Sequence, residues 1–148
     1  MQDYRRLKVW EKAHAFALEV HRVSGEFPRR GGSVIAGQLR RAALSVPSNI
    51  AEGAAKGSDL EFRRYLQIAM GSALEADYQL LVARDTRLLG ADTHDDLAAR
   101  ALEIRRMLGG LIKRINVTLK TAAPPATPSV PNQPATDQPL LLTEQRRS

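Results

Sequence analysis

The sequence predicts an all-α fold, an antiparallel up-down four-helix bundle followed by a disordered Pro-rich C-terminal tail. Four segments carry apolar residues at alternating spacings of three and four, which places these residues on one face of a helix. Short connections separate the segments, and each apolar face has to be buried against another helix. No segment alternates with period two over the length of a strand. We therefore expect one helical domain over residues 1–121 and a tail over 122–148.

The first helix is expected from Tyr4 to Ser24, because Pro28 disfavours helical backbone at Phe27 and two glycines follow. Ser33 is the expected N-cap of the second helix, in which Pro47 should cause a kink without ending the helix. The apolar seams of these two helices are Val9, Ala13, Phe16, Val20, Val23 and Phe27, and then Leu39, Ala43, Val46 and Ile50.

The third helix should start at a capping box, with Ser58 accepting from the Glu61 amide and the Glu61 side chain reaching back. We expect Gly90 to end this helix and Asp92 or Thr93 to cap the fourth. The seams are Phe62, Leu66, Ala69, Ala73, Ala76, Leu80 and Ala83 in the third helix, and Leu97, Ala101, Ile104, Leu108, Leu111 and Ile115 in the fourth.

Composition restricts the classes of function. The chain has no cysteine, which excludes disulfides, thiolate zinc sites and thiol nucleophiles. Lys and Arg number 22 against 16 Asp and Glu, a net charge of +6, and the tail contributes none of this excess. A basic folded surface favours anionic partners. The charged N-terminus predicts neither a secretory signal nor a membrane span, so we expect a cytoplasmic protein.

The segment Gln38–Gly53 combines an arginine doublet, a proline inside the helix and an Asn-Ile-Ala-Glu-Gly ending. With Val9-Trp10-Glu11-Lys12-Ala13 and the Ile68–Glu75 segment, it resembles a family of small four-helix-bundle proteins. That family includes the protein encoded in intervening sequences of large-subunit rRNA genes and the accessory variability protein of diversity-generating retroelements. The resemblance implies a ring-like homopentamer, and for the retroelement relatives an association with a reverse transcriptase and its nucleic acid.

Two polar faces are candidates for subunit or interhelix contacts, the alternative being ordinary solvated surface. One face lies on the second helix, next to apolar Leu44, Pro47 and Ala51, and the other lies on the third helix between Ile68 and Val82. We expect Arg41 and Asn49 to find partners among Ser72, Glu75 and Gln79, because buried polar groups need partners. The candidate contact residues are Gln38, Arg41, Ser45, Asn49, Glu52, Ser72 and Glu75.

A second candidate is a cationic surface that binds nucleic acid through phosphate contacts. Arg106, Lys113 and Lys120 repeat every seven residues on the outer face of the fourth helix. The alternative is a solvated surface with internal ion pairs, such as one between Glu103 and Arg106. The candidate nucleic-acid or partner-binding residues are Arg40, Arg63, Arg64, Arg105, Arg106, Lys113 and Lys120.

No catalytic, cofactor or metal site is expected. Glu11-x-x-His14 matches half of a di-iron motif, and no second copy exists. Trp10 is interpreted as a structural anchor, Gly109-Gly110 as a close-packing or kink site, and Leu140–Leu142 either as part of a flexible tail or as a docking motif.

The leading interpretation is a non-enzymatic homo-oligomer, a pentamer by resemblance, that binds RNA, DNA or a nucleic-acid-processing partner such as a reverse transcriptase. The basic surface of the helical part is the observation behind it. The alternative is a protein–protein scaffold without nucleic-acid affinity. The response of partner binding to salt distinguishes the two.

Overall fold

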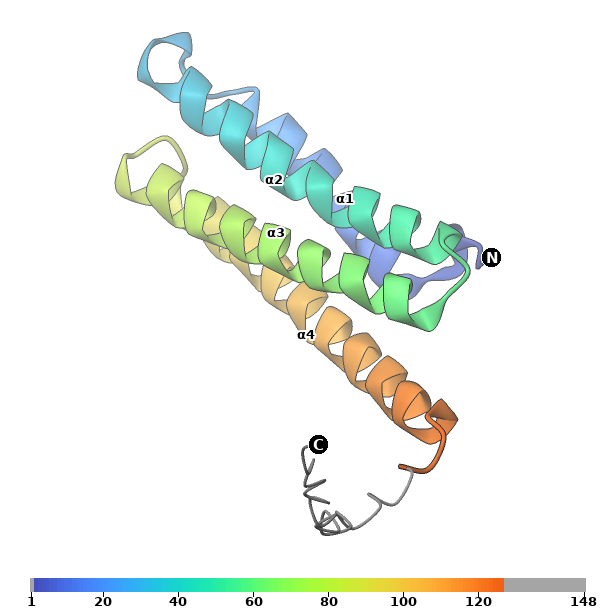
Figure 1. Cartoon of the computed structure of the whole chain (residues 1–148). Coiled ribbons are helices and arrows are strands. Elements are labelled where there is room, and N and C mark those ends of the chain that lie inside the picture. Colours follow the sequence, from blue (N-terminus) through green and yellow to red (C-terminus); the bar gives the residue numbers. More distant parts are fainter. Residues whose placement is uncertain (1, 127–148) are drawn as a thin grey trace, which may run out of the picture.

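The computed structural model describes residues 2–126, and long helices dominate this part of the chain (Figure 1). The elements, in chain order, are a 3-10 turn at Tyr4–Arg6 (η1) and the helices α1 (Lys8–Ser24), α2 (Arg29–Ala55), α3 (Asp59–Asp85) and α4 (Ala91–Ala122). No strand occurs within residues 2–126, so the predicted all-α class is confirmed. The predicted tail lies outside the described residues from position 127 onward.

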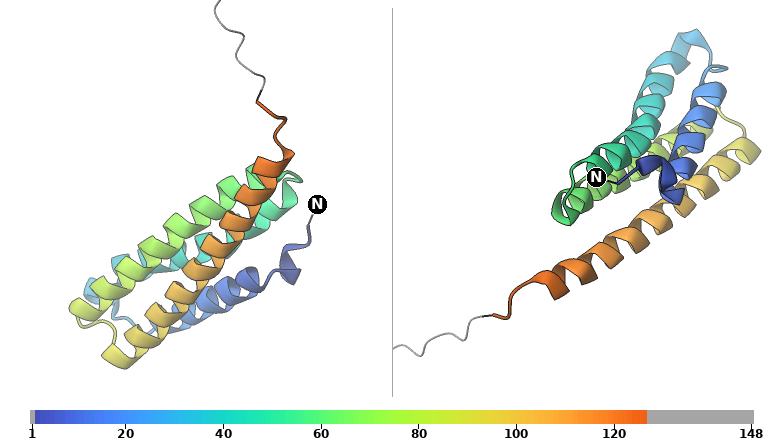
Figure 2. Two further views of the ribbon diagram at one scale, coloured as in Figure 1. Left: turned by 90° about the horizontal axis from the view of Figure 1, so that it is seen from below. Right: turned by 90° about the vertical axis from the view of Figure 1, so that its right-hand side faces the viewer.

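The helices form a closed ring of neighbours. Each helix packs against the next in the chain, and α4 returns to contact α1. Packing is most extensive between α2 and α3 and least extensive between α1 and α4. In Figure 1 and in the right-hand view of Figure 2, the last turns of α4 diverge from the other helices. The last turns of α4 therefore have fewer helical neighbours than the rest of that helix.

The core contains the predicted apolar seams, apart from one position. Every seam residue expected for α1, α2 and α3 is buried, as is the Phe27 side chain that follows α1. In α4 the seam is buried at Leu97, Ala101, Ile104, Leu108 and Ile115, whereas Leu111 is only half-buried. Leu111 lies where α4 meets the start of α1, and the loose packing there leaves its side chain partly uncovered.

The start of the first helix differs from the prediction. A 3-10 turn at Tyr4–Arg6 precedes α1, and Leu7 between them has extended backbone. Asp3 holds this turn, because its Oδ1 accepts a 3.1 Å hydrogen bond from the Arg5 amide. The α-helix therefore starts one turn later than the sequence suggests.

The start of α2 also differs, because the helix begins before the expected Ser33 cap. Its first turn is interrupted at Arg30 and at Gly31, which has a φ of 83°. That backbone conformation favours glycine. At Gly32 an added Cβ would lie 3.1 Å from the Phe27 Cβ, so the absence of a side chain permits close packing. Ser33 consequently lies inside the helix.

The interior proline of α2 does not end the helix. Pro47 is buried, and the residues with non-helical backbone in α2 are confined to Arg30 and Gly31. The helix continues to Ala55. The prediction that Pro47 does not break the helix is confirmed.

The ends of α3 and α4 are set by caps of different kinds. At the start of α3, Ser58 Oγ accepts from the Glu61 amide at 3.1 Å, as expected, while the Glu61 carboxylate lies 3.7 Å from Arg64. The helix ends at Asp85, before the predicted Gly90, and Arg87 has a φ of 63° in the connection. Gly90 is instead the N-cap of α4, so Asp92 and Thr93 lie within its first turn. Both predicted positions for this cap were wrong.

Candidate interaction surfaces

The outer face of α4 carries cations without acidic neighbours. Beyond Glu103 the helix contains five cations and no Asp or Glu. Arg106, Lys113 and Lys120 are exposed. Glu103, the nearest acid on α4, lies 3.3 Å from Lys12. Within residues 2–126 these three cations form no ion pair, so the expected pair between Glu103 and Arg106 is replaced by one to α1.

Two other arginines of the predicted cationic set connect α3 to α4. Arg63 donates from Nη1 to Asn116 Oδ1 at 2.9 Å, and Arg105 Nη1 lies 3.9 Å from Asp77 Oδ2. Both side chains are half-buried, and their Nε atoms are buried with no hydrogen-bond partner among the described residues. These two arginines therefore act mainly by fixing the register of α3 against α4.

Arg40 and Arg64 occupy different environments from the outer cations. Arg40 crosses from α2 to the end of α1, where its Nε donates to Ser24 Oγ at 2.6 Å and its Nη2 donates to the His21 carbonyl at 3.1 Å. The His21 carbonyl also accepts from the Gly25 amide and from Ser24 Oγ, each at 3.2 Å, so Arg40 adds a bond from a second helix to the last turn of α1. Arg64 is exposed on α3 and lies near Glu61, within its own helix. Of these two, Arg64 is the one whose side chain lies on the open surface.

The polar faces of α2 and α3 meet at a small hydrogen-bonded cluster. Ser45 Oγ and Ser72 Oγ are 2.9 Å apart, and Asn49 Nδ2 donates to the Ser45 carbonyl at 2.8 Å and to Ser45 Oγ at 2.9 Å. All three side chains are half-buried. Asn49 thus reaches Ser72 through Ser45 and does not bond to it directly.

The remaining polar residues of the predicted contact set point outward. Glu52 Oε1 accepts from the Tyr65 hydroxyl at 3.2 Å and lies 3.8 Å from Lys56 Nζ. Glu75 Oε1 accepts from Gln79 Nε2 at 3.4 Å, within α3. Gln38 and Arg41 are exposed, and no hydrogen bond or ion pair within residues 2–126 joins Arg41 to the α3 residues expected as its partners. These outward groups are available to a second molecule.

Large apolar side chains are exposed beside these polar groups. Leu44 on α2 is 60% exposed and Tyr78 on α3 is 66% exposed, with Ile68 and Leu74 also exposed on α3. Leu44 borders a shallow groove of about 210 Å³ between α1 and α2. The groove is lined by Tyr4, Trp10, His14, Leu44, Pro47, Ser48 and Ala51. Contiguous exposed apolar surface marks interaction sites, so these side chains are candidates for a protein–protein contact.

Trp10 is half-buried in this groove and packs against two rings. The His14 ring stacks on it with a centroid separation of 4.9 Å and an interplanar angle of 9°, and Tyr4 meets it edge-on at 4.9 Å. His14 of the Glu-x-x-His motif is thus part of an aromatic stack. Among the described residues no three His, Cys, Asp or Glu side chains come together as a metal site.

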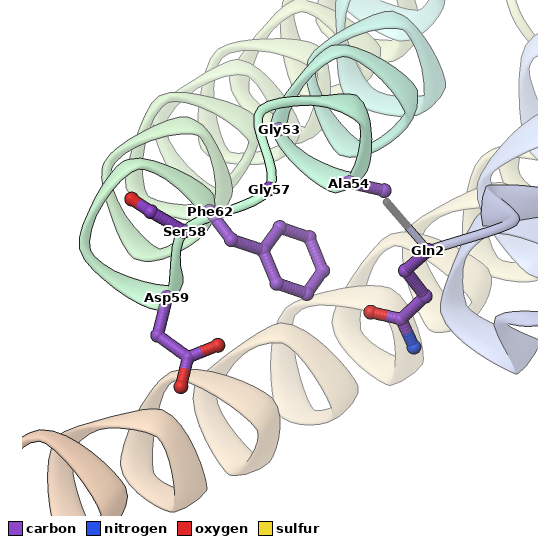
Figure 3. A pocket seen from close by; sticks show the side chains of 7 residues that line it. All are labelled: Gln2, Gly53, Ala54, Gly57, Ser58, Asp59 and Phe62. Atoms are coloured by element: carbon purple, nitrogen blue, oxygen red, sulfur yellow. The ribbon is translucent and has the colours of Figure 1, made fainter.

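A pocket of about 250 Å³ at the α2–α3 turn was not predicted from the sequence (Figure 3). Gln2 lies on one side of it, where its backbone amide donates to the Ala54 carbonyl at 3.2 Å, and Asp59 lies on the other. Gly53 packs closely there, since an added Cβ would lie 2.6 Å from the Tyr65 Cβ. The lining contains one carboxylate, that of Asp59, and places no histidine or lysine beside the Ser58 hydroxyl.

Electrostatic perturbation of ionisable groups is clearest at the surface of α1. The hydrogen bond from Arg22 lowers the pKa of Glu19, and the same contact raises the pKa of Arg22. This ion pair within one helix belongs to the stability of α1 and gives no sign of a reactive centre.

The family model of the 23S rRNA-intervening sequence proteins matches residues 5–110. The chain belongs to this family. The match ends inside α4, so Lys113 and Lys120 lie beyond the matched span. Among curated proteins, none matches the chain.

The fold is shared with a member of the S23 ribosomal protein family from Bacteroides thetaiotaomicron VPI-5482, a protein of unknown function whose crystal structure is known. The two chains are 24% identical and superpose with a TM-score of 0.67 over 71% of this chain and 98% of the other. This likeness shows the bundle fold alone. Within the described part of this intervening-sequence family member, no helix has the length and apolar character needed to cross a membrane.

Proposed function

We propose that this intervening-sequence protein is a non-enzymatic cytoplasmic homo-oligomer, a pentamer, that binds nucleic acid or a nucleic-acid-processing partner such as a reverse transcriptase. The observation that carries the proposal is the outer face of α4, where Arg106, Lys113 and Lys120 are exposed with no ion pair among the described residues. Phosphate binding needs clustered cations that are free to replace counterions. Repetition of this face in an oligomer would increase the affinity further.

Arginines of α3 lie next to the outer cations of α4 and add to the positive charge there. Arg63 bonds to Asn116, so this turn of α3 lies beside the turns of α4 that carry Lys113 and Lys120. The exposed guanidinium of Arg64 follows directly in sequence. Arg63 and Arg105 are half-buried and act mainly by holding α3 and α4 in register. A bound phosphate backbone would contact the exposed cations, with these two arginines beneath them.

Binding of labelled single-stranded RNA and duplex DNA across a salt series tests the proposal. We expect log K to fall linearly with log salt. In a variant with Arg106→Gln, Lys113→Gln and Lys120→Gln, the slope should shrink by about one for each phosphate that the protein no longer neutralises. A matched control removes three exposed cations near the opposite end of the bundle, through Arg29→Gln, Arg30→Gln and Arg87→Asn. Asparagine is chosen at position 87 because it tolerates positive φ.

The two variants carry the same net charge, so a general decrease in attraction would affect both equally. A larger decrease of the slope in the α4 variant supports the proposal. Equal decreases would reject the α4 face as the binding site. No binding at low salt would reject nucleic-acid affinity and leave the protein–protein scaffold, for which the exposed Leu44 and Tyr78 are the supporting observation.

A further inference from the structure

A groove of about 370 Å³ lies between the start of α1 and the C-terminal half of α4, where the bundle packs least tightly. Leu7, Met107 and Leu111 are half-buried and supply apolar surface to it. The complete lining is Leu7, Lys8, Val9, Met107, Gly110, Leu111 and Arg114. The groove therefore has an apolar interior and two cations.

The groove is open at Gly110, which is exposed and has no atom within 4 Å of the position that a Cβ would take. Glycine inside a helix costs about 1 kcal/mol relative to alanine. Nothing in the described packing requires glycine there. Lys8 and Arg114 are exposed, and neither forms an ion pair within residues 2–126.

The chain itself contains a segment of matching chemistry outside the described residues. Residues 137–144 read Asp-Gln-Pro-Leu-Leu-Leu-Thr-Glu, with three leucines between two acids and no base. The leucines match the apolar interior of the groove, and the acids match Lys8 and Arg114. The hydrophobic effect favours this placement, because leucine side chains would leave water for an apolar surface.

The connection between the two is long enough. Gly110 lies about 18 Å back from Ala122 along α4, at about 1.5 Å per residue. The chain from Ala122 to Leu140 spans up to about 55 Å at about 3.1 Å per residue. Attachment of the segment to the same chain gives it an effective concentration of the order of millimolar.

We propose that Leu140–Leu142 dock into the groove between α1 and α4, with Asp137 and Glu144 placed toward Lys8 and Arg114. The interaction is intramolecular. It holds the segment against the least tightly packed helix pair of the bundle. It does not depend on nucleic-acid binding.

The absence of cysteine allows a specific cross-linking test in the full-length chain. Gly110→Cys combined with Thr143→Cys should form an intramolecular disulfide about tenfold faster than a matched pair, Gly71→Cys with Thr143→Cys. Gly71 is also exposed and open, and it lies at a similar height along the bundle, because Met70 Cε would be 3.8 Å from a Cβ at Gly109. Both products are measured by mass spectrometry after mild oxidation. Each rate is divided by the rate at which a small thiol reagent labels the corresponding single cysteine, because Gly71 lies on the same face of α3 as Tyr78 and a subunit contact there would shield it.

Further substitutions distinguish docking from random reach of the tail. Replacement of all three leucines by serine should lower the rate for the Gly110 pair to that of the Gly71 pair. Lys8→Glu with Arg114→Glu should slow the reaction, and Asp137→Lys with Glu144→Lys should restore it. Equal rates for the two cysteine pairs would overturn the proposal. So would disulfides that join two chains, since these would assign the groove to a second copy.

Discussion

At the scale of single residues, Arg40 shows how a cation can serve the fold. Its guanidinium joins α2 to the last turn of α1 through Ser24 and the His21 carbonyl, and Ser24 is buried. We expect Arg40→Met to lower the free energy of unfolding by about 1–2 kcal/mol, because it removes hydrogen bonds from a half-buried charged group. Urea unfolding measures the change. Arg64→Met, at an exposed site, should change stability by less than about 0.5 kcal/mol, and equal effects would contradict the role of Arg40.

Gly53 gives a second prediction at this scale. An added Cβ would lie 2.6 Å from the Tyr65 Cβ and 3.1 Å from Phe62 Cδ2, so the helices would have to separate. We expect Gly53→Ala to destabilise the protein by about 1–3 kcal/mol, although alanine favours helix. Gly71→Ala, at an open helical position, should instead stabilise by about 0.5–1 kcal/mol. Thermal unfolding of both variants shows whether the two changes in stability have opposite signs. Stabilisation by both substitutions would show that the α2–α3 contact can relax around an added Cβ.

At the scale of elements, the polar cluster between α2 and α3 can be measured as a coupling. Ser45 and Ser72 share a 2.9 Å hydrogen bond, and Asn49 donates to Ser45. Ser45→Ala and Ser72→Ala should each lower the free energy of unfolding by about 0.5–1.5 kcal/mol. The effect of the double variant should be smaller than the sum of the two single effects, and the difference should be about 0.5–1 kcal/mol. A double-mutant cycle by chemical unfolding gives this coupling energy. Strict additivity would mean that the two hydroxyls contribute independently.

The elements also show what the sequence could predict. Buried faces follow from the 3.6-residue period, and at Leu39, Leu66 and Leu97 the expected side chains are fully buried. Helix ends were harder to predict, because the turn at Arg87 depends on positive φ in a residue other than glycine, which has no distinctive local pattern. The start of α2 was misplaced for a related reason, since Gly31 interrupts a helix that had already begun.

For the candidate surfaces, too, the sequence predicted which residues share a helix face but not which residues join two helices. Spacing along α4 was sufficient to place Arg106, Lys113 and Lys120 on one face. It could not show that Arg63 and Arg105 join α3 and α4, because the register between two helices is set by packing across the core. Half-burial of these arginines is a tertiary property that periodicity does not encode.

At the scale of the whole molecule, the exposed apolar side chains on α2 and α3 support self-association. Leu44 and Tyr78 lie on different helices, so a contact between these two faces on different copies would be head-to-tail and could close into a ring. We expect Leu44→Asp or Tyr78→Asp to weaken association by about 2 kcal/mol per contact, or about 30-fold in Kd, because a charge would be buried at the interface.

Measuring both the mass of the assembly and its affinity for nucleic acid tests whether the α2 face carries a subunit contact and whether assembly strengthens binding. Light scattering across a concentration series should show a lower mass for Leu44→Asp than for Leu18→Asp, a matched control on α1 whose side chain is 58% exposed, against 60% for Leu44. Because an oligomer presents several α4 faces at once, dissociation of the assembly should also weaken nucleic-acid binding by more than about tenfold, although every α4 cation is still present. If the mass falls and binding stays constant, single subunits bind independently. If the mass stays constant, the α2 face carries no subunit contact and the proposed head-to-tail contact between the α2 and α3 faces is rejected.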